Sequence, residues 1–234
     1  AVLRHHLRYA RALRLDHVMG LYRQYWVPAE FAATDGVYVR YPAEELTAIV
    51  CLESIRAKAV VVGENLGTVP QKVNDLMERR ALRPLYVLQF SGTGDPDRAF
   101  HQPQGSALAS LNTHDTPTWA GWWRHRDIDD QVALGLIDQA QADSAHAQRN
   151  HLVWCISQFL ITHNLAERTN GGEPAVELIA AAVLRWLAGT DAWAVLVNLE
   201  DLLGEERPQN VPGTYRERPN WLRKATETLE GLLG

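Results

Sequence analysis

The feature that most constrains the fold is a set of short segments that are apolar almost throughout. Because these segments do not alternate between apolar and polar residues, both faces of the corresponding strands are expected to be buried. Strands of this kind form a parallel sheet that is covered by helices. The segments lie at residues 12–16, 57–65, 84–92, 106–115 and 192–201.

Segments with helical spacing connect these strands. Helices are predicted from the first residues, after Pro42, after Pro70, at 151–165, at 174–189 and after Pro219. The last helix is expected to turn its apolar residues inward, namely Trp221, Leu222, Ala225, Leu229 and Leu232. The most linker-like stretch is ADSAHAQRN at 142–150.

The alternation of strands and helices favours an α/β fold. A nucleotide-binding doubly wound sheet is the weaker choice, because neither GxGxxG nor GxxxxGK[ST] follows any of the strands. We therefore predict a (β/α)8 TIM barrel of which about five strands are present. One domain is expected over 1–234, with a helical segment at 116–191 inserted before the last strand.

Three carboxylates stand where three of these strands end. Asp16 follows the first strand, Glu64 the second and Asp115 the fourth. Any one of them could be a helix cap or a turn residue. In a parallel barrel, however, the carboxyl ends of all strands meet at the face that holds the active site. Three acids there suit glycoside chemistry, which uses a nucleophile and a proton donor and needs neither a metal nor an organic cofactor.

The composition excludes several other classes of protein. The net charge of −5 gives no basic footprint for nucleic acid or for a membrane surface. Cys51 and Cys155 lie among apolar neighbours and are expected to be buried, reduced thiols. We find neither a signal peptide nor an apolar run of membrane-spanning length, so a soluble, cytoplasmic protein is expected.

Five segments resemble those of the amylomaltases, the 4-alpha-glucanotransferases of glycoside hydrolase family 77. They are RLDHVMGLYRQYWVP at 14–28, YPAEELTAIVCLESIRAKA at 41–59, VVGENLGTVP at 61–70, LNTHDTPTWAGWW at 111–123 and NVPGTYRERPNWLRK at 210–224. The resemblance runs over the whole chain, and segment 125–192 is the least distinctive part.

The resemblance implies a role for each matching residue. Asp16 would be the nucleophile, Glu64 the general acid/base, and Asp115 a stabiliser of the transition state. The substrate-binding residues would be Arg14, His114, Tyr25, Trp26, Trp119 and Asn210. Of these, Arg14 would lie against Asp16, and Trp119, together with Trp122, would offer a flat face to a sugar. Asn210, in the turn before Pro212, is equally well explained as a structural residue.

The implied reaction is transfer of a segment of an α-1,4-glucan to the 4-hydroxyl of an acceptor, with maltose and malto-oligosaccharides as substrates. Two alternatives stay open: an α-glucan hydrolase that uses the same three acids, and an inactive glucan-binding fragment. The family barrel has eight strands, so the resemblance assigns this chain to its C-terminal part. A missing N-terminal part of the same barrel is then the expected partner, and the chain alone is expected to have little activity.

Overall fold

The computed structural model describes residues 1–167 and 175–233. These residues form two compact units, each of which is described by itself. The first unit holds residues 1–85 and 106–108, and the second holds residues 86–105 and the chain from 109 onward. Pro174, where one helix was predicted to begin, lies outside the described residues.

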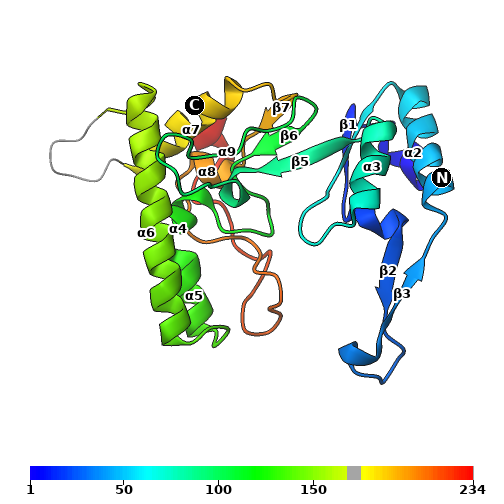
Figure 1. Ribbon diagram of the computed structural model, residues 1–234, viewed down its shortest axis with the longest axis horizontal. Coiled ribbons are helices and arrows are strands. Elements are labelled where there is room, and N and C mark those ends of the chain that lie inside the picture. Colours follow the sequence, from blue (N-terminus) through cyan, green and yellow to red (C-terminus); the bar gives the residue numbers. More distant parts are fainter. Residues whose placement is uncertain (168–174, 234) are drawn as a thin grey trace. The chain divides into compact units, whose positions relative to one another are not determined.

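Five strands form one sheet in the order β1-β4-β5-β6-β7. Of these strands, β1, β5, β6 and β7 are labelled in Figure 1. β1 pairs with β4 in parallel, with Leu15 opposite Gly63, and β4 pairs in parallel with β5. The bounds are Ala12–Leu15 for β1, Val60–Gly63 for β4, Arg83–Val87 for β5, Leu108–Ser110 for β6 and Ala194–Leu196 for β7. The predicted α/β class and the five strand positions are thereby confirmed, although each strand is shorter than its apolar segment.

The first unit covers its part of the sheet with α1 (Val2–His6), α2 (Ala43–Ala57) and α3 (Gln71–Arg79). Its core consists of Val18, Met19, Val50, Val61, Val73, Met77 and Leu82. Arg4 ties α1 to α2, since its Nε and Nη2 donate to the Glu53 carboxylate at 2.7 and 2.8 Å. The apolar spacing after Pro42 and Pro70 therefore predicted both long helices of this unit correctly.

An antiparallel hairpin in the first unit was not predicted. It consists of β2 (Arg23–Trp26) and β3 (Val37–Arg40), and it follows the short 3-10 helix η1 (Val18–Leu21). A second 3-10 helix, η2 (Ala33–Asp35), lies in its loop. Gly36 leaves room for the Tyr25 ring, which a side chain at that position would overlap. Because a two-stranded ribbon has no extended buried face, its sequence lacks the apolar run that marks the other strands.

The second unit is mainly helical. Its helices are α4 (Trp119–Trp123), α5 (Arg126–Ala133), α6 (Gln139–Thr162), α7 (Val176–Ala188), α8 (Leu199–Leu202) and α9 (Leu229–Leu233), and a 3-10 helix, η3 (Leu88–Phe90), follows β5. α5 packs against both α4 and α6. The core of the unit includes Leu88, Phe100, Leu111, Trp119, Ile156, Leu160, Ile179 and Val183.

The prediction of a linker at 142–150 is wrong, because these residues lie inside α6. A reciprocal cap begins this helix. The Asp138 carboxylate accepts from the Gln141 N–H at 2.8 Å, and the Gln141 side chain accepts from the Asp138 N–H at 2.9 Å. This capping box satisfies two of the N–H groups that a helix start leaves open, and the helix then continues through the polar stretch with Ala142 fully buried.

The helix predicted after Pro219 is also wrong for most of its length, since α9 begins only at Leu229. Trp221 has a left-handed backbone with φ of 62°, which a right-handed helix cannot include. Its N–H donates to the Gln209 carbonyl at 2.8 Å, and the Asn220 carboxamide bonds Val211 and Thr214. The segment is therefore held as a loop, and Trp221 and Leu222 are 58% and 75% exposed rather than buried.

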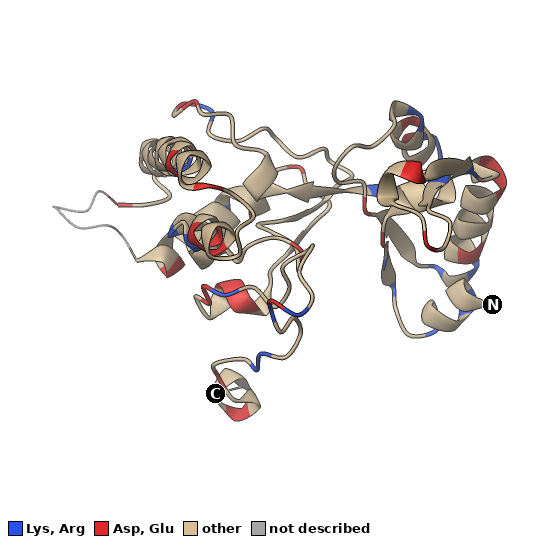
Figure 2. Ribbon diagram, turned by 90° about the horizontal axis from the view of Figure 1, so that it is seen from below, with Lys and Arg blue, Asp and Glu red and all other residues tan. Residues whose placement is uncertain are grey.

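Charged residues of both signs are interspersed over each unit (Figure 2). Cys155 is buried, Cys51 is half-buried, and both are free thiols. Within 1–167 and 175–233, every helix is too short or too polar to cross a membrane.

We predict that Gly121→Ala destabilises the second unit. Gly121 is buried in α4, and a Cβ there would overlap the Glu206 carbonyl oxygen, which is backbone and cannot rotate away. Overpacking of this kind costs about 1–3 kcal/mol or more. Urea unfolding would measure the loss. The control is Gly105→Ala, whose added Cβ would meet only ordinary contacts; equal midpoints for the two variants would contradict the prediction.

Candidate active site

Two of the predicted catalytic carboxylates come from neighbouring strands of the first unit. Asp16 directly follows β1 and Glu64 directly follows β4, whose last residues, Leu15 and Gly63, are paired in register. The pairing continues past the strands, because the Glu64 N–H donates to the Leu15 carbonyl at 2.9 Å and the Val18 N–H donates to the Glu64 carbonyl at 3.0 Å. The structure therefore brings Asp16 and Glu64 to the same edge of the sheet.

Backbone N–H groups fix the Glu64 side chain. Its Oε2 accepts from the His17 N–H at 2.9 Å, and its Oε1 accepts from the Leu66 N–H at 2.6 Å. Glu64 is only 8% exposed. His17 reaches its position through a left-handed backbone, with φ of 44° and ψ of 60°, a conformation that histidine tolerates better than most residues. Each carboxylate oxygen keeps a second lone pair for a ligand.

Asn65, the residue after Glu64, also fixes the end of β4. Its side-chain oxygen accepts from the Leu85 N–H at 3.1 Å, and its amide nitrogen donates to the Asn74 side chain at 3.1 Å. One carboxamide thus connects the end of β4 to α3 and to β5. This contact was not predicted, because the sequence gives no sign that Asn65 faces inward.

The predicted contact between Arg14 and Asp16 is present. Arg14 Nη1 lies 2.8 Å from Asp16 Oδ1, and the Asp16 side chain is 74% exposed. An ion pair so open to solvent adds little to stability. The ion pair instead orients the Asp16 side chain, because it fixes one carboxylate oxygen and leaves the other accessible.

Tyr25 and Trp26 lie on the hairpin and are 45% and 55% exposed. Successive strand residues face opposite sides, so the two rings point to opposite faces of the ribbon. Tyr25 packs edge-to-face on Tyr38 with 5.0 Å between ring centroids, and Trp26 Nε1 donates to the Tyr41 hydroxyl at 3.0 Å. Both rings are therefore held in place and stay partly exposed to solvent.

In the second unit, Asp115 lies between two of the other predicted residues. Asn210 Nδ2 donates to its Oδ1 at 2.7 Å, and His114 Nε2 lies 3.1 Å from its Oδ2. The backbone N–H of Asp115 donates to the Thr113 hydroxyl at 3.2 Å. The structure thus groups Asp115, His114 and Asn210, although the sequence alone left Asn210 equally well explained as a turn residue.

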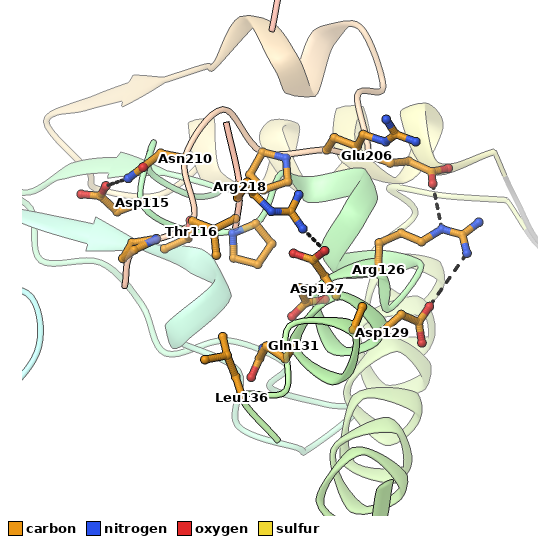
Figure 3. Close-up of a pocket in the computed structure, with 17 residues that line it drawn as sticks. Asp115, Thr116, Arg126, Asp127, Asp129, Gln131, Leu136, Glu206, Asn210 and Arg218 are labelled. Carbon is orange, nitrogen blue, oxygen red and sulfur yellow. Dashed lines mark hydrogen bonds and ion pairs between the residues drawn. The ribbon is translucent and has the colours of Figure 1, made fainter. Parts of the chain in front are cut away.

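A pocket of about 740 Å³ opens beside Asp115 and Asn210. Its walls are the loop 115–117, helix α5 with the residues after it, and the segment 206–218 (Figure 3). This volume falls in the range of about 300–1,000 Å³ that is usual for ligand sites. Among the described residues, no group of three or more His, Cys, Asp or Glu is arranged to hold a metal ion.

The predicted role of Trp119 and Trp122 as sugar platforms is wrong. Trp119 is 1% exposed and Trp122 is 7% exposed, and their rings stack on each other inside the core of the second unit. Tryptophan has a large apolar body, so its presence in a sequence does not distinguish a core position from a binding surface.

A buried polar network behind Asp115 was missed by sequence analysis. The Asp201 Oδ1 accepts from Asn112 Nδ2 and from the Trp119 N–H, both at 2.8 Å, and Asn198 Nδ2 donates to the Asn112 side chain. Burial raises the pKa of Asp201, although these donors act in the opposite direction. Its Oδ2 has no partner among the described residues. The network anchors the strand end that leads to Asp115. The only sign of this network in the sequence was an acidic residue within the apolar segment 192–201.

Comparison with known proteins identifies the family of this chain. The family model described as 4-alpha-glucanotransferase, glycoside hydrolase family 77, matches residues 1–229. The chain is 36% identical over 232 residues to the 4-alpha-glucanotransferase of Mycobacterium tuberculosis, with 94% of the chain and 31% of that relative covered. It is 32% identical over 228 residues to the Haemophilus influenzae protein of the same name, with 95% and 32% covered.

A solved structure also matches this chain. The crystal structure of amylomaltase from Corynebacterium glutamicum matches with a TM-score of 0.78 and 30% identity, and the match covers 94% of this chain and 32% of that one. The chain therefore belongs to the 4-alpha-glucanotransferase family. It spans about a third of the length of these relatives.

We predict that Asp201→Ala destabilises the protein by about 2–4 kcal/mol, because the Asn112 amide and the Trp119 N–H would lose their acceptor while staying buried. Chemical denaturation at neutral pH would measure this loss. Glu200→Ala is the control, since Glu200 is the adjacent acid and makes no side-chain hydrogen bond within the described chain. A loss no larger than that of the control would show that the network contributes nothing.

Proposed function

We propose that this chain takes part in 4-alpha-glucanotransferase chemistry on α-1,4-glucans. The observation that carries the proposal is the pair Asp16 and Glu64 on adjacent strand ends, one carboxylate exposed beside Arg14 and the other held by two backbone N–H groups. Retaining glycosidases need two carboxyl groups in different environments about 5–5.5 Å apart. Adjacent parallel strands lie about 4.8 Å apart, so their ends suit that separation.

In the first half-reaction, Asp16 attacks the anomeric carbon of the donor glucan. The glycosidic C–O bond breaks as Glu64 transfers its proton to the departing oxygen, which leaves as the 4-hydroxyl of the released chain. The retained glucan is then an ester of Asp16. In the second half-reaction, Glu64 removes the proton from the 4-hydroxyl of an acceptor, whose oxygen displaces Asp16. Both carboxyl groups return to their starting states.

Asp115 is proposed to bind sugar hydroxyls and to stabilise the positive charge that develops in the transition state. A carboxylate that keeps lone pairs free while Asn210 and His114 fix its direction is suited to that role. His114, with its ring beside Asp115, is proposed to contribute a hydrogen bond to the same hydroxyls. The substrates would be maltose and longer malto-oligosaccharides.

Transfer rather than hydrolysis requires that a sugar, and not water, reach the intermediate. Tyr25 and Trp26, on opposite faces of the hairpin, are each proposed to contact a sugar, because both rings are partly exposed and held by neighbours. On maltotriose, transfer gives glucose together with chains longer than the substrate, whereas hydrolysis gives shorter chains only. The product pattern therefore separates the two activities.

In a protein that joins this chain to the expected N-terminal part of the barrel, we expect Glu64→Gln to lower kcat on maltotriose by about 10²–10⁴, the usual contribution of general acid–base catalysis. Glu78→Gln, which changes an exposed carboxylate on α3, serves as the matched control and should leave the rate unchanged. With α-maltosyl fluoride, whose leaving group needs no proton, the Glu64 variant should still form the ester and accumulate it on the Asp16 peptide, as seen by mass spectrometry. An adduct on another residue would rule out Asp16 as the nucleophile.

A further inference from the structure

A second pocket lies between α1 and α2, and both helices belong to the first unit. Its volume of about 590 Å³ suits a small molecule. The residues that line it are Arg4, Leu7, Arg8, Glu53, Arg56 and Ala57. We propose that this α1–α2 pocket binds a small molecule that carries a phosphate group, such as a sugar phosphate. The proposal is independent of the transferase function, because none of these residues has a role in the proposed reaction.

The charge of the lining favours an anion. Three guanidinium groups and one carboxylate line the α1–α2 pocket, so two positive charges are left uncompensated. A phosphate monoester carries close to two negative charges at neutral pH. The neighbouring sequence adds to the positive charge, because residues 1–15 hold four arginines and no acidic residue. The chain as a whole has a net charge of −5, so the pocket is a local exception.

Glu53 holds two of the arginines in place. Its carboxylate accepts from Arg4 Nε and Nη2 at 2.7 and 2.8 Å and from Arg56 Nη1 at 3.2 Å. The Arg4 hydrogen bonds lower the pKa of the Glu53 carboxyl, so it stays ionised at neutral pH. Both arginine side chains are more than half exposed, and each keeps N–H donors that Glu53 does not use. A side chain that is already fixed loses less conformational freedom when a ligand binds.

Arg8 supplies the third guanidinium, which has no partner in the fold. Its side chain is exposed and, over 1–167 and 175–233, makes no hydrogen bond or ion pair. All of its donors are therefore open, and a planar guanidinium can bond two phosphate oxygens at once. Leu7 and Ala57 add an apolar surface for the carbon skeleton of a ligand. The pocket volume leaves room for that skeleton as well as for the phosphate group.

The C-terminal end of α2 also lies at the pocket. By itself it would repel an anion, because the last carbonyl groups of a helix carry partial negative charge. Arg11 offsets part of this effect, since its Nη1 donates to the Ala57 carbonyl at 3.1 Å. The Lys58 N–H donates to the Ile55 carbonyl at 3.1 Å. With these carbonyls engaged, the arginines determine the sign of the charge that a ligand meets.

Isothermal titration calorimetry of the intact chain near neutral pH tests the proposal, with glucose 6-phosphate as the probe. We expect saturable binding that an excess of inorganic phosphate displaces and an excess of glucose does not. Arg8→Gln should weaken the binding by about 10-fold, the effect of losing one charge-assisted pair. Arg8→Lys keeps the charge but cannot bond two oxygens in the same way, so its affinity should fall between those of Arg8→Gln and the wild type.

Arg98→Gln is the matched control, because Arg98 is an exposed arginine of the second unit whose side chain makes no hydrogen bond or ion pair within the described chain. A loss confined to the Arg8 variants, at wild-type Tm, supports the proposal. An equal loss in Arg98→Gln overturns it, since net charge alone would then explain the binding.

Displacement by glucose or a lack of saturable binding also overturns the proposal. So does loss of binding when this chain is joined to the expected N-terminal part of the barrel. None of these results bears on the proposed transferase activity, which the maltotriose assay measures separately.

Discussion

The parallel pairing of β1 with β4 is the constraint on which the proposed chemistry depends. Its last matched pair, Leu15 and Gly63, sets Asp16 and Glu64 side by side, and the Glu64 backbone continues the pairing on both sides. Gly63 makes this closure possible, since a Cβ there would crowd Val18 and Met77 in the core beneath the strand end. Asp16 and Glu64 are 48 positions apart in the sequence and thus become neighbours through ordinary strand hydrogen bonds. No dedicated contact between the two carboxylates is needed.

The second unit positions its functional groups by a different means. Asp115 follows β6 through a short loop, and the buried network of Asn112, Asn198 and Asp201 anchors the beginning of that loop. The pocket beside it is shaped by ion pairs between α5 and the segment 206–218. Because unpaired buried polar groups are costly, these partners restrict the loop to one arrangement. The polar interior therefore contributes to the definition of the site more than to net stability.

The sequence predicted those features that follow from local pattern. Runs such as VVVG predict a buried strand, and the acid directly after a run predicts the positions of Asp16 and Glu64 at strand ends. Asp115 was expected at a strand end too, but a loop separates it from β6, which ends at Ser110. The sequence did not predict which side chains the tertiary structure buries. Trp119 and Asp201 are both buried, although one was expected at the surface and the other was not singled out. The start of α6 was readable from the spacing of Asp138 and Gln141, but the polar residues that follow concealed the helix.

The contrast between Asp16 and Glu64 suits the two roles that the proposed double displacement would require. A nucleophile needs open access to the anomeric carbon, and Asp16 is exposed with a single guanidinium at one oxygen. A group that both gives and takes a proton must stay aligned with the same sugar oxygen through two steps, and Glu64 is buried with both oxygens held by backbone N–H groups. Because backbone donors cannot rotate away, they would keep Glu64 aligned through both steps of the proposed mechanism.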